Sequence, residues 1–170
     1  MREPMSAADQ AAVTAQLQRP PRDVAAVAYR CPCGKPAVVA TAPRLSDGTP
    51  FPTMYYLTCP RATSACSTLE SQGLMVEMAQ RLATDDDLAE SYRRAHQSYL
   101  ADRADLGEVR EIAGVSAGGM PERVKCLHAL AGHALAAGPG VNPLGDEVLE
   151  RIGVFWRHPC LSEPAEEASP

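Results

Sequence analysis

The chain has 170 residues, of which 45% are hydrophobic but only 5% aromatic, so a single domain with a core of mostly Ala, Leu and Val is expected. Sixteen Lys and Arg against 21 Asp and Glu give a net charge of −5. General nucleic-acid binding is not favoured, because such surfaces usually carry a basic stripe, and only a local basic patch remains open.

The N-terminal stretch MREPMSAADQAAV lacks an apolar run of the length found in signal peptides. No segment approaches the roughly 20 apolar residues of a membrane span. We therefore expect a cytoplasmic protein without a membrane span. In that compartment, six cysteines indicate metal ligands, catalytic groups or small buried side chains rather than disulfides.

The first third of the chain predicts one helix followed by three strands. Ser6 and Asp9 are typical of a helix start, and Pro20 with Pro21 ends this helix, which is expected over 7–18. Three short segments rich in Val, Tyr and Thr predict strands. The predicted strands are 24–30, 37–41 and 53–58.

The rest of the chain predicts helices. Cys59-Pro60 opens one that stops at Gly73, because Pro favours the first helical position and Gly the position after the last. Further helices are expected over 74–83, from Thr84 to about Leu106, over 121–137 and over 146–152. The helix 121–137 is apolar on nearly all sides, which indicates burial at the centre of the fold.

These elements predict an α+β fold, with a small antiparallel β-sheet in the N-terminal third packed against a helical bundle with a buried central helix. A single domain is expected over 1–153. Residues 154–170 are expected to form a flexible tail, because the last ten residues hold three acids, two prolines and no bases.

Four cysteines predict a metal site. Cys31 and Cys33 lie in one Pro-containing turn, and Cys59 lies at a predicted helix start, where free amides stabilise a thiolate. Cys126 lies in the predicted central helix. His133, seven residues later, returns to the same helix face and is preferred over His128 as an additional ligand.

The donor set fits tetrahedral zinc or an iron–sulfur cluster, and the spacing does not decide between them. The alternative is that Cys59 and Cys126 are ordinary buried side chains and that the CPCG segment is only a turn. Cys66 is expected in the core, and Cys160 is expected to be a lone surface thiol.

A weaker pattern is the glycine-rich segment 114–119. The backbone at Gly118 and Gly119 could form an anion nest, with positive charge from Arg123 and Lys125 and a supporting role for His128. A flexible connector explains the same residues, and no Gly-Lys-Ser/Thr pattern follows.

Three separated blocks occur in the chain: RCPCGKPAVVATAPRLSDGTPFPTMYYLTCPR, YRRAHQSYLADR and GGMPERVKCLHALAGHALAAGPGVNPLGDE. Together they closely resemble the bacterial family called domain of unknown function 501, over roughly residues 10–153, in an actinobacterial form. The resemblance supports Cys31, Cys59, Cys126, His128 and His133 as family-pattern positions, and Cys33 as a feature of the actinobacterial form. Relatives have a single Cys in this turn, which points to a metal site with three Cys ligands and one His ligand.

The resemblance implies no established activity. In actinobacteria, the members tend to be encoded near a septum-formation initiator and an exopolyphosphatase, which hints at a protein partner in cell division or phosphate metabolism. Our first hypothesis is a metal- or cluster-binding adaptor or regulator. The alternatives are a metal- or thiolate-dependent enzyme, such as a hydrolase or phosphate-handling one, and a metal-free interaction module.

Overall fold

The computed structural model describes residues 2–161, in which a three-stranded sheet is followed by a set of helices. This arrangement confirms the predicted α+β class. In chain order the elements are α1 (Ala7–Leu17), β1 (Val24–Arg30), β2 (Pro36–Thr41), β3 (Tyr55–Leu57), α2 (Pro60–Ser71), α3 (Leu74–Thr84), α4 (Asp86–Ala104), the 3-10 helix η1 (Arg110–Ile112), α5 (Leu127–Ala137) and α6 (Pro143–Ile152).

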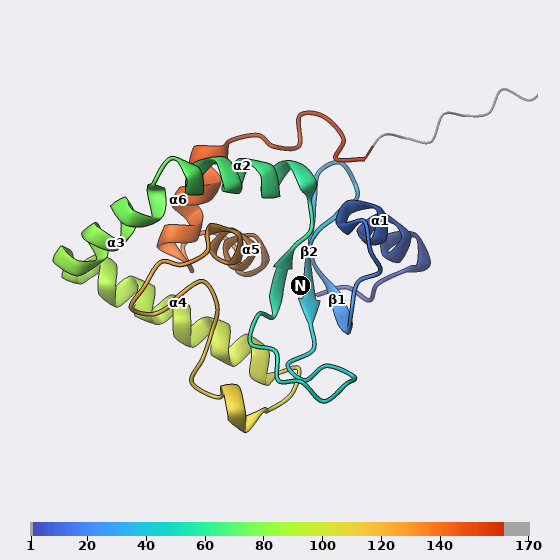
Figure 1. Ribbon diagram of the computed structural model, residues 1–170, viewed down its shortest axis with the longest axis horizontal. Helices are drawn as coiled ribbons and strands as arrows, with labels where there is room; N and C mark the ends of the chain where they lie inside the picture. The colour runs from blue at the N-terminus through green and yellow to red at the C-terminus, as the bar shows by residue number, and fades with distance from the viewer. Residues whose placement is uncertain (1, 162–170) are drawn as a thin grey trace, which may run out of the picture.

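The sheet is antiparallel in the order β1-β2-β3, and its middle strand β2 is buried along its whole length. Helix α1 lies on one side of the sheet, while α5 and the remaining helices lie on the other (Figure 1). Coverage on both faces explains the continuous apolar run in β2, because no residue of this strand points to solvent.

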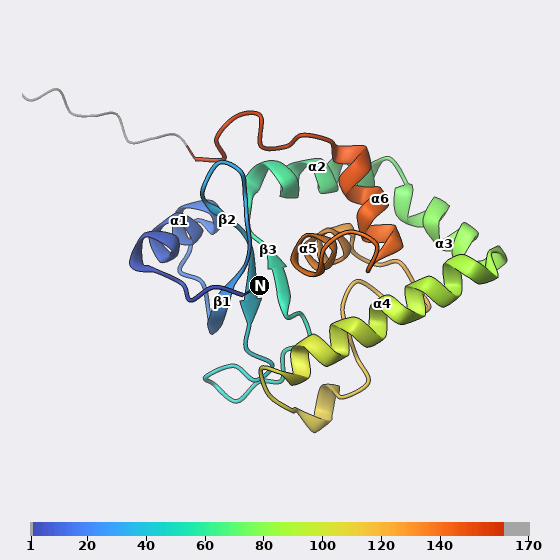
Figure 2. The same cartoon turned by 180° about the vertical axis from the view of Figure 1, so that it is seen from behind.

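Helix α5 lies between the sheet and the other helices, as its apolar sequence predicts (Figure 2). Two glycines allow this close packing. A Cβ atom on Gly132 would lie 3.3 Å from the Tyr55 carbonyl oxygen of β3, and one on Gly145 of α6 would lie 2.3 Å from the Leu130 carbonyl oxygen. The backbone of α6 therefore approaches α5 more closely than a side chain at Gly145 would permit, and the contact of β3 with Gly132 is tighter than most Cβ contacts.

The prediction that this central helix starts at Pro121 is wrong, since α5 begins at Leu127. Gly118 and Gly119 adopt positive φ angles, and their carbonyls accept hydrogen bonds from the amides of Lys125 and Arg123, each 2.8 Å long. This folded-back loop occupies the segment before α5. Cys126 consequently becomes the N-cap residue of α5 instead of an interior helical residue.

Helix α4 packs against the rest of the fold through Tyr92, Ala95 and Tyr99, which are fully buried. The helix starts slightly later than expected, because the Asp85 side chain accepts a hydrogen bond from the Leu88 amide at 3.0 Å and caps it. The Tyr99 hydroxyl in turn accepts a hydrogen bond from the Met54 amide, which ties α4 to the entry of β3.

After α6 the chain runs back across α2 towards the turn between β1 and β2 (Figure 1). Phe155 is buried and packs edge-on against Trp156, and the Arg61 guanidinium donates to the Pro159 carbonyl at 3.0 Å. Residues 154–161 of the expected tail thus contact the folded chain. Residues 162–170 lie outside the described part.

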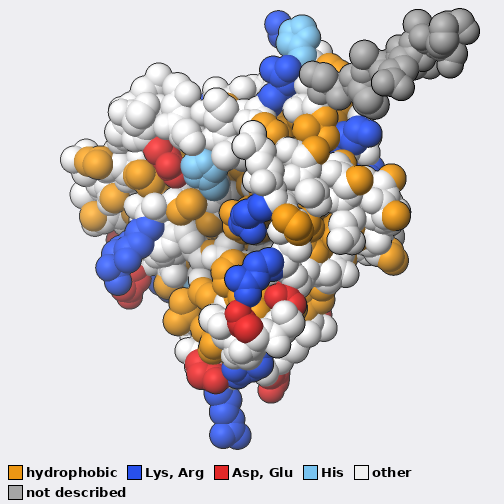
Figure 3. Space-filling view, turned by 45° about the vertical axis from the view of Figure 1, so that its right-hand side comes forward, with side chains coloured by type: hydrophobic (Ala, Val, Ile, Leu, Met, Phe, Trp, Pro, Cys, Tyr) orange, Lys and Arg blue, Asp and Glu red, His pale blue; other side chains and the backbone are white. Residues whose placement is uncertain are grey.

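The surface drawn in Figure 3 carries Lys and Arg side chains that are separated by uncharged and acidic ones, so this face has no continuous basic stripe. Among the described helices, none combines the length and apolar character needed to cross a membrane.

Candidate functional site

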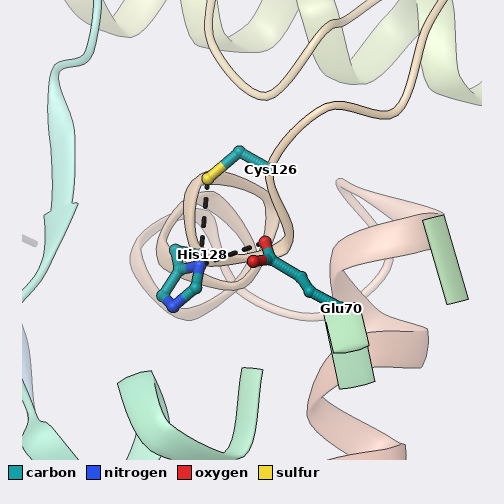
Figure 4. Close-up of side chains that lie close together, drawn as sticks. All are labelled: Glu70, Cys126 and His128. Carbon is teal, nitrogen blue, oxygen red and sulfur yellow. Dashed lines mark hydrogen bonds and ion pairs between the residues drawn. The ribbon is translucent and has the colours of Figure 1, made fainter. Parts of the chain in front are cut away.

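Three side chains with metal-ligand chemistry converge where α2 ends and α5 begins (Figure 4). Glu70 lies in the last turn of α2, Cys126 is the N-cap of α5, and His128 is the second residue of α5. One oxygen, one sulfur and one nitrogen from these residues all lie within 4.8 Å of one another. Within residues 2–161, this is the one group of three or more such side chains that meets this criterion.

Glu70 is held in place by the start of α5. The side chain of Cys126 does not cap the helix, so the first amides of α5 need another acceptor. The Glu70 Oε1 atom accepts a hydrogen bond from the Leu127 amide at 2.8 Å and lies 3.1 Å from His128 Nδ1. A carboxylate is favourable at this position, because the N-terminal end of a helix carries partial positive charge.

The ring of His128 is oriented by α2. Its Nε2 atom lies 3.1 Å from the Thr63 carbonyl oxygen and 3.2 Å from Ser67 Oγ. Since a carbonyl oxygen can only accept a hydrogen bond, Nε2 carries a proton. Nδ1 is thereby left facing the Glu70 carboxylate and the Cys126 sulfur, which lies 3.9 Å away.

The Glu70 carboxylate can only accept, so its contact with Nδ1 is satisfied by a second ring proton or by a bound cation. Contact with Cys126 raises the pKa of His128 to about 9, with a further contribution from the Glu70 charge and against the effect of burial. Burial raises the pKa of Cys126, but the His128 ring and the Ala129 amide outweigh it, and the net direction is downward. In the metal-free site, both shifts act towards the charged forms, the Cys126 thiolate and the His128 imidazolium.

The site is open to solvent on one side. The side chains of His128 and Glu70 are 25% and 24% exposed. Cys126 and His128 also line a cavity of about 350 Å³ that lies between β3 and the start of α5. The other residues that line it are Thr53, Tyr55, Tyr56, Leu57, Thr63, Gly118 and Ala129. A small ligand in this cavity would therefore contact Cys126 and His128.

The structure does not bring the five predicted metal ligands together. Cys59 immediately precedes α2, whereas Cys126 lies beside Glu70 in the last turn of the same helix. Eleven residues of helix correspond to about 16 Å along its axis. Cys31 and Cys33 lie with Cys59, away from Cys126, and metal binding by these cysteines stays a prediction.

His133 does not join Cys126, because α5 starts too late for the two residues to share a helix face. Its ring is fully buried, lies parallel to Tyr55 at 5.9 Å between centroids, and has Nδ1 3.2 Å from the Asn142 side-chain amide. Burial lowers its pKa to about 4. These contacts indicate that His133 is a neutral packing residue of the core.

Of the two remaining cysteines, Cys66 lies where it was expected and Cys160 does not. Cys66 is fully buried, as expected of a core residue, and burial raises its pKa to about 12. The expectation that Cys160 is a lone surface thiol is wrong. Its sulfur lies 3.9 Å from the sulfur of Cys33, because the chain after α6 folds back over α2.

The glycine-rich segment forms an ordered loop in which the carbonyls of Gly118 and Gly119 bind the amides of Lys125 and Arg123. The side chains of Arg123 and Lys125 are exposed. Gly118 borders the cavity beside Cys126. Anion binding by this loop stays a prediction.

Glu70 is the member of the site that the sequence interpretation missed. It is the one acidic residue of α2, and Thr63 and Ser67 precede it at seven and three residues, so all three share a helix face. That isolated acid on a polar face was the available signal. Without the position of α5, however, nothing in the sequence pairs it with His128.

Comparison with known proteins places the chain in a family. The family model described as "Protein of unknown function (DUF501)" matches residues 27–150. No curated protein matches the chain. No solved structure matches it.

Proposed function

We propose, for a chain that belongs to the DUF501 family of proteins of unknown function, that Glu70, Cys126 and His128 bind one zinc ion. The proposal depends chiefly on the His128 ring: a main-chain carbonyl fixes the proton on Nε2, and Nδ1 points to a carboxylate and a thiol. Metal-bound histidines typically donate the proton of their second nitrogen in this way.

The distances between the three ligand atoms fit a single small ion. For tetrahedral zinc, bond lengths near 2.1 Å to nitrogen or oxygen and 2.3 Å to sulfur give N–O and N–S separations of about 3.4 and 3.6 Å. The observed separations are 3.1 Å from His128 to Glu70 and 3.9 Å from His128 to Cys126. Both separations are within about 0.3 Å of the tetrahedral values, and the Glu70 oxygen and Cys126 sulfur lie within 4.8 Å of each other.

The donor set favours zinc over an iron–sulfur cluster. Zinc is commonly bound by combinations of thiolate, imidazole and carboxylate, whereas iron–sulfur clusters are held mostly by cysteine thiolates. Only one cysteine, Cys126, belongs to this group. Three protein ligands leave a fourth position, and the cavity lined by Cys126 and His128 supplies space for a water or a small anionic ligand there.

A metal-free cysteine nucleophile fits the geometry less well. In a Cys–His catalytic pair, the base uses one ring nitrogen for the nucleophile and the other for the group that orients it. Here Cys126 and Glu70 both face Nδ1, and Nε2 is directed at the Thr63 carbonyl. Because the Cys126 sulfur and the Glu70 carboxylate face the same ring nitrogen, a cation bound by all three side chains fits this geometry better than a proton relay.

Cobalt substitution tests the proposal, because Co²⁺ reports its ligands through visible absorption. Metal-free protein titrated with Co²⁺ should show a thiolate-to-cobalt band, and His128→Ala and Cys126→Ala should each lose one equivalent of bound metal. Cys66→Ala is the matched control, since Cys66 is a nearby thiol outside the group. Unchanged metal content in both folded site variants would refute zinc binding here. Rapid metal-independent alkylation of Cys126 would instead support the nucleophile.

A further inference from the structure

A second group of cysteines gathers at one end of the sheet, and the sheet topology explains why. Cys31 and Cys33 lie in the turn that leads into β2, and Cys59 follows β3. Because β2 and β3 are antiparallel, the end of β3 lies beside the beginning of β2. The amides of Thr58 and Cys59 both reach the Ala37 carbonyl, which fixes Cys59 next to this turn.

The turn itself is well defined. The Cys31 amide donates to the Lys35 carbonyl at 2.9 Å, and the Gly34 amide donates to the Cys31 carbonyl at 2.8 Å. Gly34 has φ of +87°, a conformation that L side chains rarely adopt, and it allows the chain to reverse after two cysteines. Cys31 is 2% exposed and lies close enough to Cys33 and Cys59 for their thiols to affect its pKa.

The fourth cysteine arrives from the far end of the chain. Cys160 is 127 residues from Cys33 in the sequence, yet their sulfur atoms are 3.9 Å apart. The Gln16 side chain on α1 donates to Cys160 Sγ at 3.4 Å and to the Pro36 carbonyl at 2.8 Å, so α1 also supports this position. Burial raises the pKa of Cys160, and the neighbouring thiols of Cys59 and Cys33 add to this effect.

We propose that Cys31, Cys33, Cys59 and Cys160 bind a structural zinc ion, separate from the ion proposed at Glu70, Cys126 and His128. Four cysteines are the typical ligands of a closed structural zinc site. Two sulfurs bound to one tetrahedral zinc lie about 3.8 Å apart, given Zn–S bonds near 2.3 Å, and the Cys33–Cys160 separation of 3.9 Å matches this value.

No three of the four sulfurs lie within 4.8 Å of one another, so the proposed site forms only when the side chains rearrange on binding the ion. The proposal requires this rearrangement to leave the turn and the strand end in place. Zinc would replace the thiol protons, which are released to solvent as each cysteine becomes a thiolate.

A Cys33–Cys160 disulfide is the alternative use of this pair. It would involve two of the four cysteines and leave Cys31 and Cys59 without a role, and it would need an oxidant to accept two electrons. Zinc uses all four side chains without a change of oxidation state. In the proposed state, the ion fastens the segment after α6 to the turn between β1 and β2.

Metal content and proteolysis of purified full-length protein test this site. We expect about two zinc ions per chain in the parent protein, and one fewer in Cys160→Ser or Cys33→Ser. Trypsin should cleave after the exposed Arg157 at least about tenfold faster in both variants, because the segment is released. Cys66→Ala, which alters a buried thiol outside both groups, should change neither readout.

Zinc X-ray absorption on the parent protein is independent of variant folding. Four sulfurs at one site and one at the other predict an average of about 2.5 sulfur ligands per zinc. His128→Ala should raise this average to about four by emptying the mixed site, so failure of one site is distinguishable from failure of the other. Full zinc content in folded Cys160→Ser, or a Cys33–Cys160 disulfide in protein prepared under reducing conditions, would overturn the proposal.

Discussion

The Glu70 carboxylate and the His128 ring lie 3.1 Å apart, although 58 residues separate them in the chain. The contact joins the end of α2 to the start of α5, and it exists because Glu70 also accepts a hydrogen bond from the Leu127 amide. One side chain thus caps a buried helix and completes the candidate metal site. Structural and ligand roles of Glu70 can be separated by substitution.

Glu70→Gln should weaken zinc binding at least about tenfold while leaving the fold nearly intact. The amide oxygen of Gln can still accept from Leu127, so the free energy of unfolding of the metal-free protein should fall by only about 1 kcal/mol. A neutral amide is a poor zinc ligand. Competition with a chromophoric chelator gives the affinity, and urea unfolding gives the stability. Glu77→Gln, an exposed acid on α3, is the matched control.

His133→Ala should destabilise the protein by about 2–4 kcal/mol without changing its metal content. The substitution leaves a cavity beside Tyr55 and Tyr99 and removes the partner of the Asn142 amide. Chemical unfolding and zinc analysis of the same preparation provide both readouts. Loss of one metal equivalent with an unchanged unfolding midpoint would instead make His133 a ligand.

His133 should also make stability depend on pH between about 6.5 and 4. Its folded-state pKa is about 4, below the ordinary value of 6.5, so the unfolded chain binds more protons in this interval. Stability is therefore full above pH 6.5 and falls as the pH decreases towards 4, by up to about 3 kcal/mol. Unfolding curves of the parent protein and His133→Phe at several pH values test this. Parallel pH profiles would show that another group is responsible.

Gly145→Ala should destabilise the protein by several kcal/mol, because the new Cβ would lie 2.3 Å from the Leu130 carbonyl oxygen. Gly114→Ala is the control: no atom lies within 4 Å of its Cβ position, and we expect little change. Thermal unfolding of both variants measures the difference. Equal melting temperatures would mean that α5 and α6 do not pack as described.

Local signals in the sequence were sufficient for most of the fold. Ser6 with Asp9 marks the start of α1, Pro60 the start of α2, and the apolar residues of α5 indicate its burial. The start of α5 was misplaced, because Pro121 suits a helix start as well as the loop that Gly118 and Gly119 close. Pro121 alone cannot distinguish the two, because the hydrogen bonds from Arg123 to Gly119 and from Lys125 to Gly118 decide the structure of this segment.

The candidate sites were harder to predict, because they depend on tertiary packing. The sequence identifies Cys31, Cys33, Cys59 and Cys126 as chemically interesting but gives no measure of which ones meet. Because α5 begins at Leu127 and not at Pro121, six residues later than predicted, Cys126 is the N-cap and lies beside His128 and Glu70. Likewise, Cys160 acquires neighbours only because the chain after α6 folds back across α2.

The central claim is tested most directly by anomalous diffraction at the zinc absorption edge. The crystals are grown with two equivalents of Zn²⁺ per chain, one for each proposed site. The account predicts a peak between Glu70 Oε1, Cys126 Sγ and His128 Nδ1, about 2.0–2.3 Å from each atom. Lack of a peak at this position, with His128 Nδ1 hydrogen-bonded to Glu70 in zinc-containing crystals, would contradict it.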